Sequence, residues 1–375
     1  MIYLDHGSTT PLAPEVAEAM ARATAVAWGN PSSDHGSGLA AARVLEEARL
    51  RVATALRADP AEVVFTSGGT EANNLALKGR LLRGGRPGGR LVVSAIEHPS
   101  VMACAAWLEG LGVAVDRLPV DGEGLVDPDD LRRRLRPDTR LVSVGHGNHE
   151  IGTVQPLAEL ARVCAEAGVP FHTDACQSFT REPLPAPPDL PDLVSVNAHK
   201  IHGPKGAGAL RVRRGLALEP LMHGGPQEGG LRPGTQNVPA LAGFGVAVSL
   251  ADPAEYQRQA ALRDRLLERL LSIRGAHLHG SRTRRLCHHL SLRFDGVSGR
   301  ALAAALDRAG VRVSRGSACS SGTTAPSPVL LALGIPPAEA LGAVRITLGR
   351  GTTEAEVDQA GAIIDQAVAT LRRTP

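Results

Sequence analysis

The sequence predicts an α/β protein with two parts: a large domain, in which helices enclose a mostly parallel seven-stranded sheet, and a smaller α/β C-terminal domain. Two observations lead to this fold class. Seven short, valine-rich runs alternate with amphipathic segments, as buried parallel strands alternate with their crossover helices. The pattern then changes near residue 250, where a long amphipathic segment begins a second α/β region.

The expected strands of the large domain are apolar on both faces, which is typical of a sheet that helices cover on both sides. They lie at 62–67, 90–95, 113–118, 140–145, 170–175, 192–198 and 208–213. The segments between them, such as TEANNLALKGRLL and LAELARVCAEAG, are amphipathic and predict helices.

The second region is expected to begin with one long helix, which Asp252 and Pro253 open as N-cap and first residue. A strand at HHLSLRF, a helix at GRALAAALDRAG, a turn-rich stretch and two further helices follow. We therefore expect a large domain over residues 14–249 and a small domain made of residues 1–13 and 250–375.

The composition excludes several classes of partner. The net charge of +3 and the aromatic content of 2% offer neither a basic face nor stacking rings for nucleic acid. No apolar run approaches the roughly 20 residues that span a bilayer, and the N-terminus lacks the pattern of a signal peptide. Five scattered cysteines, an odd number, indicate free thiols in a reducing compartment. We expect a cytoplasmic protein that binds neither nucleic acid nor membranes.

The stretch FTSGGTEANN predicts a turn from a strand into a helix, with Gly69 and Thr70 beside the helix N-terminus. Unpaired N–H groups at such a terminus attract phosphate, and glycine lets a ligand approach the backbone closely. The plainer interpretation is an ordinary glycine-rich turn, and this stretch alone does not decide between the two.

The stretch FHTDACQS puts Asp174 at the carboxyl end of an expected strand, with Gln177 three residues later. Open α/β sheets bind ligands at this edge. Asp174 could hold a protonated heterocyclic nitrogen, although without context a helix N-cap is an equally good interpretation.

Lysine is rare in this chain, which has three among 41 basic residues: Lys78, Lys200 and Lys205. Lysine can serve as an amine nucleophile, whereas arginine cannot. Lys200 is the better candidate because it directly follows the expected strand at 192–198, while Lys205 lies in a turn. A phosphate seat, a strand-end aspartate and an amine are together the groups that bind pyridoxal phosphate.

One cysteine differs from the others in its surroundings. Cys319, in SRGSACSSGTTAPS, lies among small residues on an expected loop, whereas Cys104 and Cys164 are expected to be buried. A metal site is not expected, because His288 and His289 with the cysteine before them fit no zinc pattern.

A series of motifs in one order, over nearly the whole chain, resembles the cysteine desulfurases of the NifS/IscS type. These are class V members of the fold-type I pyridoxal-phosphate enzymes. The motifs are YLDHGSTTP, GNPSSDHG, VVFTSGGTEANNLALKG, IEHPSV, NHEIGTVQP, FHTDACQ, AHKIHGPKGAGAL, MHGGPQE, RPGTQN, SRGSACSSG and RITLGRGTTEAEVD. The resemblance implies a fold-type I transferase that uses pyridoxal 5′-phosphate.

The resemblance also implies a role for each matching residue. Lys200 is similar to the Schiff-base lysine, His98 to the histidine that stacks on the cofactor ring and moves protons, and Cys319 to the catalytic cysteine. The implied cofactor-binding residues are Gly69, Thr70, His98, His149, Asp174, Gln177, Asn197, His199, Lys200 and Thr235.

Two further implications concern substrate and assembly. Asn30 and Arg345 resemble the pair that holds the substrate carboxylate. Thr235 resembles a residue that reaches the cofactor of the other subunit, which implies a homodimer. Three positions depart from the family: His149 stands where asparagine is usual, Asn197 where serine is usual, and His6-Gly7-Ser8 where Asn-Ala-Ala is common.

The implied function is conversion of L-cysteine to L-alanine, with the sulfur left as a persulfide on Cys319 for a sulfur-acceptor protein of iron–sulfur cluster assembly or of tRNA or cofactor thiolation. Two alternatives stay open. A selenocysteine lyase or another class V β-lyase shares the cofactor machinery, and a selenium-specific enzyme should tolerate loss of Cys319. The alternative outside the enzymes is a catalytically weak sulfur-relay subunit. We keep it open because His149 and Asn197 depart from the family pattern.

Overall fold

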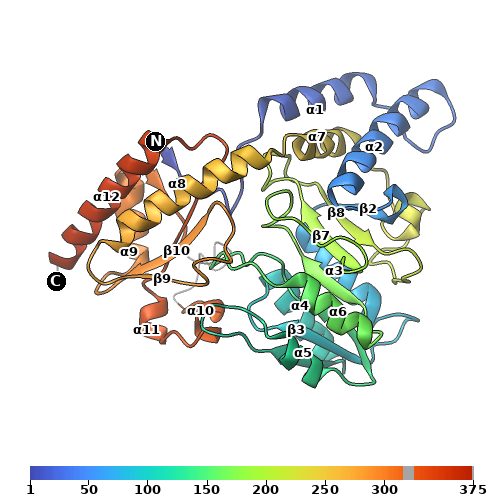
Figure 1. Ribbon diagram of the computed structural model, residues 1–375. Coiled ribbons are helices and arrows are strands. Elements are labelled where there is room, and N and C mark those ends of the chain that lie inside the picture. The colour runs from blue at the N-terminus through green and yellow to red at the C-terminus, as the bar shows by residue number, and fades with distance from the viewer. Residues whose placement is uncertain (316–324, 374–375) are drawn as a thin grey trace.

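The computed structural model describes residues 1–315 and 325–373. Its largest element is a seven-stranded sheet in the order β2-β8-β7-β6-β5-β3-β4 (Figure 1). The strands are β2 (Val63–Thr66), β3 (Arg90–Ser94), β4 (Ala114–Leu118), β5 (Thr139–Ser143), β6 (Phe171–Asp174), β7 (Leu193–Asn197) and β8 (Gly208–Val212).

The strand β8 runs antiparallel to both of its neighbours, and every other adjacent pair in this sheet is parallel. The mostly parallel seven-stranded sheet predicted from the sequence is therefore confirmed, and each of the seven expected strands is present. Because the strands from β3 to β7 in this order are parallel, their carboxyl ends meet at one edge of the sheet.

Successive residues of a strand point to opposite faces, and in this sheet both faces are buried. In β3, Val92 belongs to one hydrophobic cluster, while Leu91 and Val93 belong to another. In β5, Val142 and Leu141 divide in the same way. Valine and leucine on both faces thus anchor two layers of helices, one on each side of the sheet.

The helices of this part follow the strands in the expected alternation. They are α1 (Pro14–Val26), α2 (Gly36–Ala55), α3 (Gly69–Leu81), α4 (Pro99–Gly110), α5 (Pro128–Arg134), α6 (Leu157–Glu166) and α7 (Val238–Ser249), with short 3-10 turns η1 (Pro60–Glu62) and η2 (Gln227–Gly230). None of the helices in the described part of the chain is long and apolar enough to cross a membrane.

The C-terminal region forms a second, smaller unit around an antiparallel sheet in the order β12-β10-β9 (Figure 1). Its strands are β9 (Ala276–Leu278), β10 (His289–Phe294) and β12 (Val344–Thr347), and β1 (Ile2–Tyr3) pairs with β11 (Val311–Arg312). Its helices are α8 (Pro253–Leu271), α9 (Gly299–Arg308), α10 (Pro328–Ala332), α11 (Pro337–Ala340) and α12 (Glu354–Arg373).

The long helix α8 begins as expected, because the Asp252 side chain accepts a hydrogen bond from the Ala254 N–H and Pro253 takes the first helical position. A third hydrophobic cluster joins the N-terminal Ile2 and Leu4 to this unit. We propose that the three clusters are the cores of the two predicted domains, 14–249 and 1–13 with 250–375.

A buried ion pair fixes the segment η2 against the sheet. Arg49 of α2 donates two hydrogen bonds of 2.8 Å to the two carboxylate oxygens of Glu228, and a third of 2.7 Å to the Val63 carbonyl. Glu228 also accepts the Phe65 N–H at 2.9 Å. The carboxylate has no exposed surface, whereas Glu46, the other partner of Arg49, is 60% exposed.

We predict that Glu228→Ala lowers the free energy of unfolding by about 3–5 kcal/mol, because it leaves the Arg49 charge buried without its partner. Glu46→Ala removes an exposed partner of the same arginine and should cost no more than about 1 kcal/mol. Urea denaturation of both variants measures the difference. Equal shifts of the unfolding midpoint would contradict this account.

Seven histidines are buried among the described residues, and burial lowers the pKa of six of them. The pKa falls to about 3 for His6, to about 4 for His146, His172 and His279, and well below the usual value for His288 and His289. These side chains are therefore neutral in the folded protein at pH 7. The unfolded chain binds protons at the same positions below about pH 6.5.

A buried neutral histidine does not weaken the fold at a pH above its pKa in the unfolded chain. Below that pH the unfolded chain takes up a proton that the folded protein does not, so the free energy of unfolding falls until the pH reaches the pKa of the folded state. We predict that the free energy of unfolding falls between pH 7 and pH 5, by about 1.4 kcal/mol per pH unit for each proton taken up. The urea midpoint measured across this range tests it, with His223→Gln as a control because His223 is exposed. A midpoint that stays constant from pH 7 to pH 5 would rule out neutral buried histidines.

Candidate active site

The carboxyl edge of the large sheet borders a cavity of about 250 Å³. Ten of the residues that the sequence proposed for the site line it: Gly69, Thr70, His98, His149, Asp174, Gln177, Asn197, His199, Lys200 and Arg345. They come from the ends of β6 and β7, the starts of α3 and α4, the connection after β5, and β12 of the smaller unit. The fold therefore gathers these segments, distant in sequence, around one space.

The other three candidates are not among the residues that line this cavity. Asn30 is exposed between α1 and α2, where its side-chain oxygen accepts a hydrogen bond of 2.9 Å from the Ser32 N–H. Thr235 is exposed between η2 and α7. Cys319 lies outside the described residues. The roles expected for these three residues stay predictions.

The turn before α3 forms the part of the cavity suited to an anion. Gly68 has a φ of 152°, which favours glycine, and α3 begins at the next residue. A Cβ added to Gly69 would lie 2.4 Å from the sulfur of Cys176, so no larger residue fits there. The N–H groups of the first helical turn have no partner within the helix, and the helix dipole favours a negative charge beside them.

Asp174 ends β6 and is held as an anion inside the protein. Its oxygens accept hydrogen bonds of 2.9 Å from the Cys176 N–H and 2.7 Å from the Asn73 side chain. Burial alone raises the pKa of Asp174, but the neighbouring His98 and Lys200 and these two hydrogen bonds outweigh it. The net result is a pKa below the usual value, so the carboxylate is ionised at neutral pH.

Lys200 follows β7 directly and is 8% exposed. Its backbone carbonyl accepts a hydrogen bond of 2.6 Å from Arg181, which fixes the turn that carries it. The lysine is close enough to Asp174 to lower the pKa of that carboxyl group. The cavity therefore pairs an amine with an anion on neighbouring strands.

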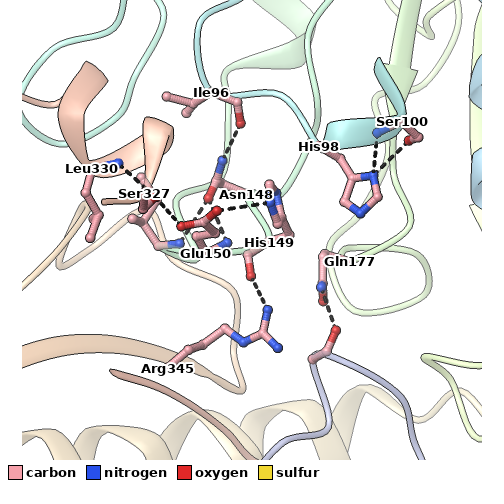
Figure 2. Close-up of polar contacts among 12 residues, drawn as sticks. Ile96, His98, Ser100, Asn148, His149, Glu150, Gln177, Ser327, Leu330 and Arg345 are labelled. Carbon is pink, nitrogen blue, oxygen red and sulfur yellow. Dashed lines mark hydrogen bonds and ion pairs between the residues drawn. The ribbon is translucent and has the colours of Figure 1, made fainter. Parts of the chain in front are cut away.

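His98 caps the N-terminus of α4, and its hydrogen bonds indicate which ring nitrogen carries the proton (Figure 2). Its Nδ1 accepts the Ser100 N–H at 3.1 Å and lies 2.8 Å from the Ser100 hydroxyl. Burial, followed by the nearby His149, lowers the pKa of His98 to about 3, so the ring is neutral. Because Nδ1 accepts, the neutral ring carries its proton on Nε2, and the His149 ring lies 5.0 Å away edge-on.

His149, one of the departures from the family pattern, sits in a tightly bonded turn. The Asn148 side chain before it donates to the Ile96 carbonyl at 2.8 Å and accepts the Glu150 and Ile151 N–H groups. The ring of His149 lies 3.5 Å from the Glu150 carboxylate. Its side chain thus reaches the cavity on a backbone that has little freedom to move.

Arg345 brings a positive charge from the smaller unit to the cavity wall and is 2% exposed. Its guanidinium donates to the His149 carbonyl at 2.8 Å, to Asp5 at 3.0 Å and to the Ser8 hydroxyl at 2.6 Å (Figure 2 shows the first of these). Its Nε has no hydrogen-bond partner among residues 1–315 and 325–373. This nitrogen is available to a ligand.

The described residues on either side of the segment that includes Cys319 bind to residues of the cavity or next to it. On one side, Ser314 exchanges backbone hydrogen bonds of 3.0 and 2.8 Å with Arg345. On the other, the Ser327 hydroxyl donates to the Glu150 carboxylate and caps α10 (Figure 2). Both anchors thus join this segment to residues of the cavity or next to it.

Sequence reasoning missed five residues that line the cavity: Gly7, Ser8, Asn73, Ser100 and Cys176. Asn73 could have been predicted, because it lies one turn into a helix that packs on the sheet, where a buried polar side chain needs a hydrogen-bond partner. Within the described ranges, no group of three or more histidine, cysteine, aspartate or glutamate side chains could hold a metal ion.

Comparison with known proteins agrees with the resemblance. The family model described as aminotransferase class-V matches residues 2–360. The cysteine desulfurase IscS of Dictyoglomus turgidum is 42% identical over 375 residues, which cover 99% of this chain and 95% of that protein.

Solved structures agree as well. A structure titled NifS-like protein has a TM-score of 0.91 and 34% identity, with 98% of this chain and 99% of that chain covered. The structure titled SspA in complex with cysteine has a TM-score of 0.84 and 34% identity, with 94% and 100% covered. The chain belongs to the class-V aminotransferase family, and the relatives that it resembles over nearly its whole length include cysteine desulfurases.

Proposed function

We propose that this chain is a pyridoxal-phosphate-dependent cysteine desulfurase. It converts L-cysteine to L-alanine and keeps the sulfur as a persulfide on Cys319, so that the Cys319 thiol and cysteine together become the persulfide and alanine. The observation that carries the proposal is that Ser314 and Ser327, on either side of the segment that includes Cys319, bind Arg345 and Glu150 beside the cavity that Lys200 and Asp174 line.

The residues around the cavity fit pyridoxal phosphate. The Asn73, Gln177 and Asn197 side-chain oxygens are buried and have no hydrogen-bond partner among the described residues. Buried polar atoms in that state need a ligand or water. Gly69 and Thr70 with the α3 N-terminus suit the phosphate, helped by Asn197 and His199, and Asp174 suits the pyridine nitrogen. When bound, the cofactor supplies an electron sink for negative charge at the substrate Cα.

Three side chains then have distinct tasks. Asp174 keeps a negative charge beside the pyridine nitrogen, because its hydrogen bonds hold it ionised. Lys200 would supply the amine that holds the cofactor, and the same amine would act as the base that takes a proton from the substrate Cα. His98 offers a proton at Nε2, since its Nδ1 is committed to Ser100.

The substrate carboxylate is expected at Arg345, whose Nε lacks a partner in the described part of the chain. We include Asn30 in this role, as the sequence predicted. Gln177 and His149 complete the cofactor contacts: the Gln177 amide donates to the Gly7 carbonyl at 2.8 Å, which leaves its oxygen to face the cavity.

Elimination among the cysteines supports Cys319 as the nucleophile. The other four are buried, and burial raises the pKa to about 11 for Cys104 and Cys287, to about 12 for Cys164, and well above the usual value for Cys176. Attack on sulfur requires a thiolate, which these four positions disfavour.

We further propose a homodimer in which Thr235 contributes to the cofactor site of the second copy, because Thr235 is exposed in one chain and does not line its own cavity. The persulfide sulfur passes to an acceptor protein of iron–sulfur cluster assembly or of thiolation. We propose that these steps take place in the cytoplasm, because the five scattered cysteines indicate a reducing compartment.

We predict that Cys319→Ser lowers sulfide release from L-cysteine by at least about a hundredfold, since no thiolate then meets the substrate sulfur. The cofactor's spectral response to L-cysteine should persist, because Lys200 and Asp174 are unchanged. Alanine and sulfide, measured together with a reductant present, test this.

Cys104→Ala is the matched control, because it removes a thiol that lies in the core and should keep sulfide release. Full desulfurase activity in Cys319→Ser would overturn the assignment of the nucleophile. So would a result in which Cys176→Ser loses this activity while Cys319→Ser keeps it. Retained activity toward selenocysteine in Cys319→Ser, with cysteine activity absent in the wild type, would indicate a selenocysteine lyase.

A further inference from the structure

A second, smaller cavity of about 20 Å³ adjoins the first. His98, His149, Asp174 and Lys200 line both cavities, whereas Glu97 lines only the smaller one. A buried cavity needs roughly 10–15 Å³ to hold one water molecule. The smaller cavity thus has room for a single water beside the groups of the active site.

The carboxyl group of Glu97 is fully enclosed and unevenly bonded. Its Oε1 accepts the Gly145 N–H at 2.8 Å and also accepts the Ser94 hydroxyl. Its Oε2 has no hydrogen-bond partner within residues 1–315 and 325–373. Two donors on one oxygen and none on the other is the arrangement of a carboxylic acid, in which Oε1 is the carbonyl and Oε2 carries the proton.

Glu97 and Asp174 lie in contrasting environments. Both oxygens of Asp174 accept hydrogen bonds, and the charge of Lys200 lowers the pKa of Asp174. Burial, together with the charge of Asp174, raises the pKa of Glu97 to about 7 against the two hydrogen bonds that Oε1 accepts, which lower it. Two carboxyl groups whose environments separate them in this way take different protonation states.

Five titratable residues other than Glu97 line the small cavity: His98, His149, Asp174, Cys176 and Lys200. Asp174 comes from the end of β6 and Lys200 from the end of β7, while His98 precedes α4 and His149 follows β5. The two histidine rings lie edge-on to each other, and His98 is neutral. Among these groups, Asp174 is the one whose charge raises the pKa of Glu97.

We propose that Glu97 is a positioning residue, kept as a neutral acid whose Oε2–H donates to a water in the small cavity, so that Asp174 bears the negative charge of the site alone among the described carboxyl groups that line the two cavities. An ionised Glu97 would compete with Asp174 for the positive charges nearby. The cofactor part of this inference rests on the proposed function, whereas the protonation state of Glu97 does not.

The test is infrared spectroscopy of the full-length protein, first without cofactor. At pH 6, where exposed carboxyl groups are ionised, the wild type should show the carbonyl band of a protonated acid, and Glu97→Gln should lack it. As the pH rises through about 7, Glu97 loses its proton and the band should fade. Glu182→Gln is the matched control, because burial also raises the pKa of Glu182 but Glu182 does not line the cavity.

A second variant keeps the test decisive if Glu97→Gln does not fold. A Cβ on Gly145 would lie 3.2 Å from Oε2 of Glu97, so Gly145→Ala should press on this oxygen, crowd the water and shift the band while Glu97 itself is kept. Identical spectra for the wild type and Glu97→Gln at pH 6, or a band that Gly145→Ala leaves in place, would overturn the proposal.

The positioning role is tested with pyridoxal phosphate added. The cofactor's visible absorbance in the wild type should change with pH near 7, and Glu97→Gln should remove that inflection. An unchanged inflection would refute the role of Glu97 even if the infrared band is found. If no absorbance band forms at all in the wild type, the proposed function fails, and the infrared result still decides the state of Glu97.

Discussion

The charge on Asp174 is the constraint on which the rest of the site depends. A carboxylate in a buried position is costly unless hydrogen bonds and opposite charges compensate it. Here the Cys176 N–H and the Asn73 amide bind it directly, and Lys200 supplies a positive charge from the next strand. The anion can then hold a cationic ring nitrogen, which is what an electron-sink cofactor needs. Replacing the partners of Asp174 would therefore weaken its hold on the ring nitrogen without changing the residues proposed to bind the substrate.

The smaller unit contributes what the large sheet lacks. Arg345 projects from β12 into the cavity wall and ties the chain's N-terminal segment to it through Asp5 and Ser8. Ser314 and Ser327 fasten the two flanks of the segment with Cys319 to Arg345 and Glu150. Figure 1 shows the two units side by side, with β10 and α10 turned toward the large sheet. Arg345 and both described flanks of the segment that includes Cys319 thus belong to the smaller unit, whereas the residues that we propose for the cofactor come mainly from the larger one.

Much of this site could be predicted from the sequence because parallel strands bring their ends together. Asp174 and Lys200 each follow an expected strand, and the glycine-rich turn before α3 opens at the same edge. Asn73 and Ser8 were not predicted as site residues, because their hydrogen-bond partners lie more than twenty residues away in the sequence. Glu97 was not predicted, because its interest lies in a buried oxygen that has no partner among the described residues. No local pattern encodes such partners. Asn30 and Thr235 were assigned by resemblance alone, and one copy of the chain gives no contact that would place them at a cofactor.

The central claim is that the amine of Lys200 holds a pyridoxal phosphate beside Asp174. Borohydride reduction of the protein purified with this cofactor, followed by peptide mapping, tests the claim most directly, since the chain has only Lys78 and Lys205 as other lysine side chains. The account predicts a pyridoxyl group on Lys200. A label on Lys78 or Lys205, or no label on any lysine, would contradict it.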